Sequence, residues 1–320
     1  MTGEVAAIVI GRNEGERLVR CLASLMGQVT PIIYVDSGST DGSVAAARDV
    51  GAEVVELDMS QPFTAARARN AGLARLSEIA PEGEFVQFLD GDCELRDGWV
   101  DTALKAIRGA DDIAVACGRR RERFPETSIY NRLIDMEWDT PLGEARACGG
   151  DALMRRAALV QVDGYRDDLI AGEEPEMCYR MRQKGWRILR IDAEMTWHDA
   201  AITRFGQWWQ RNRRAGHAFA EGAAVHGAGP ERFRVAETRR ALVWGAGVPL
   251  AAGLGALIFT PWALSLLLAW PAQMMRLWAR GFPWEQAMFL ILGKIPEARG
   301  VLDYWIGRVS GQRKALIEYK

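Results

Sequence analysis

Two aspartates separated by one glycine, Asp90 and Asp92, are the residues of this sequence best suited to chemistry. They follow the apolar run 85–89, whose length and composition predict a buried strand. Divalent cations prefer oxygen ligands and commonly bridge carboxylates and phosphates. A loop at the carboxyl end of a strand is also where open α/β sheets bind ligands. The pair therefore predicts a metal site for a diphosphate, while Asp-Gly-Asp is also ordinary turn chemistry.

The segments that must position this loop alternate between strand-like and helical patterns. Strands are predicted at 5–10, 31–35, 52–57 and 85–89, and helices at 14–26, 44–50 and 64–77. Such alternation predicts a parallel sheet with right-handed crossovers. The expected fold class is therefore α/β, a Rossmann-like nucleotide-binding sheet with helices on both faces.

The region after the aspartate loop is less regular. A short strand and helix are predicted within 151–160, two short strands at 188–191 and 194–198, and a helix rich in tryptophan and arginine at 205–221. Between them, Gly172-Glu173-Glu174-Pro175-Glu176 has the composition of a helix start. Proline suits the first turn of a helix, and acidic side chains there complement the helix dipole.

Composition limits the classes of function. With 320 residues, 49% of them hydrophobic, the chain can bury one large core or two smaller ones. The net charge of −2 does not indicate a nucleic-acid partner. Five cysteines without a C-x-x-C pair are typical of reduced thiols in a cytosolic domain. We therefore expect the domain to work on the cytoplasmic side, with no signal peptide before the first strand.

The apolar residues are concentrated in one segment. Residues 241–275 carry no charged side chain over 35 positions, which is too long for one span of roughly 20 residues. We expect a transmembrane hairpin at 241–279, with arms at 241–259 and 262–279, because arginines flank it on both sides. A basic connector at 221–240 precedes it, and an amphipathic, basic tail at 280–320 follows. The alternative is a buried helical pair in a soluble domain.

Five short motifs, in their order along the chain, resemble those of the inverting family-2 glycosyltransferases with a GT-A fold. They are Ile8-Val9-Ile10-Gly11-Arg12-Asn13-Glu14, Val35-Asp36-Ser37-Gly38-Ser39-Thr40-Asp41-Gly42-Ser43, Ala68-Arg69-Asn70-Ala71-Gly72, Asp90-Gly91-Asp92, and Gly172-Glu173-Glu174 followed by Arg180. The resemblance covers residues 5–220. It implies a transferase domain at 1–220, with a nucleotide-donor half at 1–118 and an acceptor half at 119–220.

The resemblance also implies roles for single residues. The nucleotide-sugar site would be formed by Gly11, Asn13, Glu14, Asp36, Arg69 and Asp90. Asp36 would accept a hydrogen bond from the imide of uracil, which favours a UDP-sugar, although a turn acid before a helix has the same appearance. Mg²⁺ or Mn²⁺ would be held by Asp92, with Asp90 and His198. A packed structural histidine remains the alternative for His198.

The general base is the least certain assignment. Glu174 stands where the family usually has the aspartate of a Glu-Asp pair, so the resemblance implies that it deprotonates the acceptor hydroxyl. Glu173 is the next candidate, and acids that complement a helix dipole are the structural alternative. The run Arg119-Arg120-Arg121-Glu122-Arg123 could hold pyrophosphate, but we expect it to be solvated.

The expected function is transfer of a sugar from a nucleotide-sugar to a lipid-linked or envelope-glycan acceptor. The protein would lie at the cytoplasmic membrane with its catalytic domain facing the cytoplasm. A processive polysaccharide synthase is the alternative, but Gln210-Arg211-Asn212-Arg213-Arg214 is followed by Ala215 and not by the tryptophan of such enzymes. A degenerate transferase acting as a membrane scaffold is the non-enzymatic alternative. A nucleotidyltransferase or a dehydrogenase would need glycine-rich loops that this sequence lacks.

Overall fold

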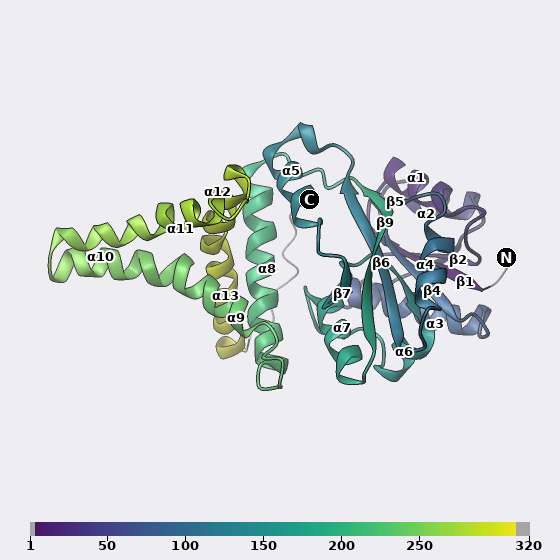
Figure 1. The fold of residues 1–320 in the computed structure, drawn as a ribbon. Helices are drawn as coiled ribbons and strands as arrows, with labels where there is room; N and C mark the ends of the chain where they lie inside the picture. Colours follow the sequence, from purple (N-terminus) through teal and green to yellow (C-terminus); the bar gives the residue numbers. More distant parts are fainter. Residues whose placement is uncertain (1–3, 312–320) are drawn as a thin grey trace. The chain divides into compact units, whose positions relative to one another are not determined.

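A computed structural model describes residues 4–311 of the chain. The chain separates into two units, of which the first ends at Ala201 and the second begins at Ile202 (Figure 1). The helix that follows residue 204 therefore belongs to the second unit, whereas the sequence analysis groups it with the transferase domain. The predicted boundaries after residues 220, 240 and 279 stay predictions.

A mixed sheet forms the centre of the first unit. Its nine strands are β1 (Val5–Gly11), β2 (Ile32–Asp36), β3 (Glu53–Glu56), β4 (Phe85–Asp90), β5 (Cys93–Leu95), β6 (Ile113–Glu122), β7 (Gly143–Ala145), β8 (Ala152–Arg155) and β9 (Arg187–His198). They are ordered β3-β2-β1-β4-β8-β6-β9-β5, and β7 pairs with β9.

Beyond β4 the strands of this sheet are mixed in direction. Strands β3, β2, β1 and β4 are parallel, as predicted, and β8 is antiparallel to both β4 and β6. The two short strands predicted at 188–191 and 194–198 are one strand, β9, which also pairs antiparallel with β5. The α/β class is confirmed, as is the parallel arrangement of the four strands from which it was predicted.

Helices flank the sheet (Figure 1). They are α1 (Glu16–Leu25), α2 (Ser43–Asp49), α3 (Ala65–Ile79), α4 (Trp99–Ile107), α5 (Ile129–Glu137), α6 (Arg156–Gln161) and α7 (Glu173–Gln183), with a short 3₁₀ helix, η1 (Pro125–Thr127). Helix α1 buries Leu18, Cys21, Leu22 and Leu25, the face that its spacing predicts. Together with Ile8 and Phe88 of the sheet they belong to one continuous core.

Gly72 explains why a small residue ends the third motif. A Cβ atom at this position would lie 2.5 Å from Ile8 Cγ2 and 3.2 Å from Val35 Cγ2. Helix α3 can therefore pack against β1 and β2 only because no side chain stands between them. This close packing sets the depth at which Arg69, on the same helix, enters the sheet edge.

Replacement of Gly72 by alanine is expected to lower the free energy of unfolding by about 1–3 kcal/mol, because the extra methyl overpacks the core. Urea denaturation followed by circular dichroism measures this change. Gly42→Ala is the matched control, since its Cβ would meet nothing within 4 Å and its φ is −77°. Equal stability of both variants with the wild type would contradict the packing argument.

The carboxyl edge of the parallel strands gathers the predicted ligand-binding residues. In the sheet register, Gly11 is paired with Asp36 and Ile10 with Asp90. The chain runs outward from β1 to β2 on one side, and β4 lies on the other, so the strand order reverses beside β1. Open α/β sheets bind ligands in the crevice at such a switch point.

The second unit is helical. Its elements are α8 (Phe205–His226), α9 (Val235–Leu242), a π-helical segment η2 (Val243–Gly247), α10 (Val248–Ile258), the 3₁₀ helix η3 (Pro261–Leu268), α11 (Ala269–Trp278), α12 (Trp284–Leu292) and α13 (Lys294–Ser310). Helices α8 and α13 approach closely because Gly216 and Gly300 lie at their crossing, where a Cβ would meet backbone atoms of the other helix. Beside them, Arg213 forms an ion pair of 2.5 Å with the buried Asp303.

Two apolar arms extend from this unit as a helical hairpin (Figure 1). The first is continuous from Val235 to Ile258, and among residues 4–311 it is the one helix long and apolar enough to cross a membrane. The second comprises η3 and α11, in the region where the sequence analysis expects the other arm. Whether the hairpin spans a membrane stays a prediction.

Side chains on this hairpin are unusually exposed for their type. Leu257, Phe259 and Trp262, around its tip, are more than four-fifths exposed. In a buried helical pair these apolar side chains would be covered by protein, so their exposure favours an apolar environment around the hairpin. Of the basic tail residues, Arg308 lies in α13, and Arg313, Lys314 and Lys320 lie outside the described residues.

Candidate active site

Arg69 is the central side chain of the candidate site. It is only 4% exposed, and its guanidinium donates to Asp90 Oδ1 at 2.8 Å and to Glu173 Oε1 at 2.7 Å. Its Cζ also lies 5.5 Å from the centre of the Tyr165 ring. Burial lowers the pKa of Arg69, but the carboxylates of Asp90 and Glu173 outweigh it and raise the pKa overall. A fixed positive charge therefore joins the donor-side loop to the start of helix α7.

Asp92 and His198 meet at the other side of the aspartate loop. The register of the sheet brings them together, because Cys93 of β5 is paired with His198 of β9. The distance from His198 Nε2 to Asp92 Oδ1 is 3.5 Å, and both side chains are buried. One carboxylate oxygen and one imidazole nitrogen at this spacing fit a divalent cation. Asp92, Cys93 and His198 also have ligand atoms within 4.8 Å of one another.

Glu122 lies behind His198, and sequence reasoning did not identify it. Its Oε2 is 3.7 Å from His198 Nδ1, a buried nitrogen to which no residue within 4–311 forms a hydrogen bond. The carboxylate is itself held by the backbone N–H groups of Phe124 and Ala200 and by the Asn131 amide. A carboxylate behind a ligating histidine fixes the ring orientation and tautomer. Glu122 is therefore suited to keep Nε2 free toward Asp92.

Glu122→Gln is expected to weaken Mn²⁺ binding about 10- to 100-fold, as the loss of a carboxylate behind a metal-binding histidine usually does. Paramagnetic resonance of free Mn²⁺ measures the affinity directly. Glu194→Gln is the control, since Glu194 forms a surface ion pair with Arg121 on the same sheet. Unchanged affinity in Glu122→Gln would assign this carboxylate to structure alone.

The loops that follow β1 and β2 are joined to each other. Asn13 has a φ of 55°, its N–H donates to Ser39 Oγ at 2.9 Å, and its side-chain oxygen accepts from Thr40 N at 2.7 Å. Glu14 pairs with Arg17 at 2.8 Å. At Gly11 and Gly91, an added Cβ would lie 3.2 Å from Glu14 Cγ. The two glycines therefore let Glu14 lie against the backbone of both strand ends.

Asp36 is buried at the tip of β2 and already accepts three hydrogen bonds. Tyr34 donates its hydroxyl to Oδ1, and the N–H groups of Gly38 and Ser39 donate to Oδ2, each at 2.9 Å. Burial is the main cause of the raised pKa of Tyr34, which keeps its hydroxyl a donor. Asp36 thus stabilises the turn that follows β2, which is the structural alternative to base recognition. Its role in recognising the nucleobase stays a prediction.

Glu174 is held away from Arg69 in a pocket of thiols. It is 5% exposed, and its Oε1 accepts from Cys148 N at 2.6 Å. The Sγ atoms of Cys148 and Cys178 lie 3.0 and 3.1 Å from the same oxygen. Cys178 is one helical turn after Glu174, so both side chains lie on one face of α7. The structure therefore brings Glu173, and not Glu174, into direct contact with the Arg69 group.

Asp151 and Arg120 complete the charged centre. Asp151 is fully buried; it accepts from Asp90 N at 3.1 Å and pairs with Arg120 at 2.8 Å. Arg120 also donates to Gly149 O and lies 5.2 Å from the Trp138 ring centre. The expectation of a solvated run is wrong for Arg119 and Arg120, which β6 directs into the protein, and holds for Arg121. Strand alternation could not have predicted this result, because Arg119 and Arg120 are adjacent in β6 and both are buried.

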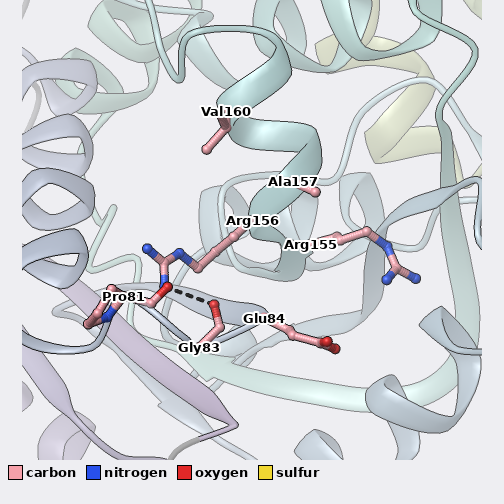
Figure 2. Close-up of a pocket in the computed structure, with 7 residues that line it drawn as sticks. All are labelled: Pro81, Gly83, Glu84, Arg155, Arg156, Ala157 and Val160. Carbon is pink, nitrogen blue, oxygen red and sulfur yellow. Dashed lines mark hydrogen bonds between the residues drawn. The ribbon is translucent and has the colours of Figure 1, made fainter.

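A separate surface pocket lies at the opposite end of β4. It is lined by Pro81, Gly83, Glu84, Arg155, Arg156, Ala157 and Val160 (Figure 2). Its lining includes Glu84, directly before β4 begins, whereas Asp90 ends that strand. The Arg156 guanidinium is occupied by the carbonyls of Ala80, Pro81 and Gly83. This pocket is therefore distinct from the candidate active site.

Among the comparisons with known proteins, the family match lies within the first unit. Residues 6–161 match the model of glycosyl transferase family 2. A TPR repeat-containing protein of Synechococcus elongatus is 37% identical over 216 residues, which cover 67% of this chain and 45% of that protein. Glycosyltransferase AglE of Haloferax volcanii is 24% identical over 66% of this chain and 71% of its own length. The chain thus spans less than half of the first of these relatives.

Solved structures extend the fold comparison over nearly the whole chain. The mannosyltransferase PcManGT of Pyrobaculum calidifontis superposes with a TM-score of 0.64 at 18% identity, covering 94% of this chain and 88% of its own. TarS of S. aureus reaches a TM-score of 0.51 at 15% identity, covering 95% of this chain and 54% of its own. At these identities the likeness concerns the GT-A fold. The match at residues 6–161 shows that this part of the chain is a glycosyl transferase family 2 domain.

Proposed function

We propose that this protein catalyses metal-dependent, inverting transfer of a sugar from a nucleotide-sugar donor to a lipid-linked or envelope-glycan acceptor. The transfer takes place at the cytoplasmic face of the membrane. The observation that carries the proposal is the arrangement of Asp90, Asp92, Arg69 and His198 at one edge of the sheet, beside the switch point. These residues provide oxygen and imidazole ligands and one buried cation for a diphosphate.

The donor side is supported by residues and by relatives. PcManGT is described in complex with GDP-Man and Mn²⁺. The loops joined by Asn13 and Ser39 border the edge where Gly11 and Asp36 end their strands. A UDP-sugar is favoured because Asp36 can accept a hydrogen bond from the imide N–H of uracil. A carboxylate has about four acceptor positions, and Asp36 uses three of them within the protein, so one is left for the base.

The metal residues are Asp92 and His198, with Asp90 alongside, and Mg²⁺ or Mn²⁺ suits this donor set. A cation held there would supply charge neutralisation of the diphosphate leaving group. Asp92 and His198 would provide ligand atoms for it, and Glu122, whose Oε2 is 3.7 Å from His198 Nδ1, would orient the imidazole. Arg69 keeps Asp90 in place and places a positive charge beside it. Asp151 and Arg120 position the backbone of the aspartate loop.

Glu174 is proposed as the general base, with Glu173 as the alternative. All three hydrogen bonds to Glu174 end on Oε1, so Oε2 is the oxygen suited to take a proton from an acceptor hydroxyl. Glu173 is engaged by Arg69 through its Oε1. Its place in that ion pair favours a positioning role over proton transfer.

Attachment to the membrane is proposed for the hairpin formed by α10, η3 and α11. Its exposed apolar side chains and the flanking Arg239, Arg240, Arg276 and Arg280 fit an element inserted from the cytoplasmic side. ExoA of Rhizobium meliloti, 24% identical over 67% of this chain and 70% of its own length, is named a succinoglycan biosynthesis protein. This relative supports an envelope-glycan acceptor.

A donor panel tests the proposed function. Thermal shift on the detergent-purified protein is measured with UDP, GDP, dTDP and CMP, each with and without Mn²⁺. One nucleotide, UDP by preference, is expected to raise the melting temperature only with Mn²⁺, since a ligand at a hundredfold excess stabilises by about 2.7 kcal/mol. An Mn²⁺-dependent shift with GDP would support the proposed function but identify the donor nucleobase as guanine and not uracil. No shift with any nucleotide would overturn the proposal in favour of a membrane scaffold.

A further inference from the structure

The thiol pocket around Glu174 has features that sugar transfer does not require. Cys148 comes from the loop before Gly149, and Cys178 comes from helix α7. Their sulfur atoms are 3.9 Å apart, and both side chains are buried. Glu174 Oε1 lies between them at 3.0 and 3.1 Å. Two sulfurs and a carboxylate oxygen, from three sequence positions, thus converge on one point.

We propose that Cys148 Sγ, Cys178 Sγ and Glu174 Oε1 form a second metal site, which takes Zn²⁺ or another thiophilic divalent cation. Thiolate ligands select such ions, whereas the oxygen-rich Asp90–Asp92 edge suits Mg²⁺ or Mn²⁺. The two sites therefore differ in chemistry as well as in place. This inference concerns binding and does not depend on the proposed function.

The sulfur–sulfur distance agrees with tetrahedral zinc ligation, and the sulfur–oxygen distances require a small movement of Glu174. Zinc–sulfur bonds of about 2.3 Å place two sulfur ligands about 3.8 Å apart, close to the 3.9 Å observed here. The same geometry places sulfur and oxygen ligands about 3.5 Å apart, so the Glu174 carboxylate must withdraw by about 0.5 Å. A fourth position is left for water or a small thiol.

Binding at this site exchanges protons for the metal. In the structure the two thiols donate to Glu174 Oε1, so both carry a proton. The incoming cation takes the place of these two protons, which leave to the solvent buffer, and no electron is transferred. With two thiolates, one carboxylate and a divalent cation, the site then carries a net charge of −1.

Occupation of this site has a consequence for Glu174. A metal-bound carboxylate is a weaker base, and the ion also ties α7 to the loop that carries Gly149 and Gly150. If the proposed function holds, Zn²⁺ at this site would inhibit sugar transfer without displacing Mn²⁺ from Asp92. Only this consequence, and not the binding of the metal, rests on the proposed function. The cysteine site would thus be a point of metal regulation.

Cobalt substitution tests the site by a spectrum that does not involve activity. Tag-free, full-length protein in detergent is titrated with Co²⁺ under reducing conditions. The expected result is an intense near-ultraviolet thiolate-to-cobalt band with the visible bands of tetrahedral Co²⁺, both removed by one equivalent of Zn²⁺. Cys148→Ser and Cys178→Ser are each expected to lose the thiolate band or halve it, with weaker Zn²⁺ binding.

Three further variants separate the alternatives. Cys21→Ser removes another buried thiol and is expected to keep the full spectrum, as is Asp92→Ala, which removes the other candidate metal site. Glu174→Gln keeps the size of the side chain and is expected to weaken binding while retaining both sulfurs. Far-ultraviolet circular dichroism confirms that each variant is folded. Absence of a thiolate band in the wild type, or a band lost in Cys21→Ser but kept in Cys148→Ser and Cys178→Ser, overturns the proposal.

Discussion

Asp92→Ala is expected to reduce sugar transfer about a thousandfold or more. Asp92 supplies a carboxylate oxygen 3.5 Å from His198 Nε2, and its removal leaves a divalent cation with one buried ligand on this side of the site. Neutralisation of the leaving diphosphate is worth several kcal/mol, and each 1.36 kcal/mol corresponds to about tenfold in rate. Initial rates with saturating donor, at several Mn²⁺ concentrations, measure the loss.

The matched control for this variant is Asp112→Ala. Asp112 is half-exposed and forms a surface ion pair with Arg187, away from the aspartate loop. Its replacement is expected to leave the rate within about twofold, since exposed ion pairs contribute little. Full activity of Asp92→Ala at ordinary Mn²⁺ concentrations would remove the metal site from the account.

The second large effect on activity is expected at the start of helix α7, where the neighbouring Glu173 and Glu174 have different contacts. Glu174→Gln is expected to lower kcat by about 10²- to 10⁴-fold with little change in donor KM, because it removes the proposed base. Glu173→Gln is expected to raise the donor KM more than it lowers kcat. The reason is that Glu173 holds Arg69, and Arg69 in turn holds Asp90.

Steady-state kinetics of both variants separate these roles. Glutamine retains the size of the side chain and one acceptor oxygen, so both proteins are expected to fold. The pattern that would reverse the assignment is a large loss of kcat in Glu173→Gln together with near-normal turnover in Glu174→Gln. In that case Glu174 would be a structural acid of the thiol pocket.

Much of the nucleotide-binding half could be predicted from the sequence, because its strands and helices are local and strongly patterned. The run 85–89 and the helix containing Leu18, Leu22 and Leu25 were found within one or two residues of their bounds. Asp90 could be placed at the ligand-binding edge because it ends a predicted strand, whereas Arg69, on helix α3, could be placed there only through the family resemblance. These predictions rest on periodicity and on the order of elements, which tertiary contacts did not alter.

The second half could not be predicted in the same way, because its contacts depend on antiparallel pairing between distant segments. Strand β9 is predicted as two strands, 188–191 and 194–198, because the exposed Asp192 interrupts its apolar pattern. Glu122 and His198 become neighbours only through the register of β6 with β9. The i,i+4 spacing of Glu174 and Cys178 places these two on one helix face, but nothing in the sequence indicates that Cys148 joins them. Such sites require the register of the sheet.

The central claim is metal-dependent sugar transfer at a membrane, and a transfer assay with radiolabelled donor tests it most directly. The protein is incubated with Mn²⁺, a panel of UDP- and GDP-linked [¹⁴C]sugars and membranes that contain candidate acceptors, and label is counted in the lipid and glycan fractions. The account predicts label in one of these fractions, dependent on Mn²⁺ and absent with Asp92→Ala. Label that stays in the donor with every nucleotide-sugar and membrane, UDP- and GDP-linked alike, would contradict it.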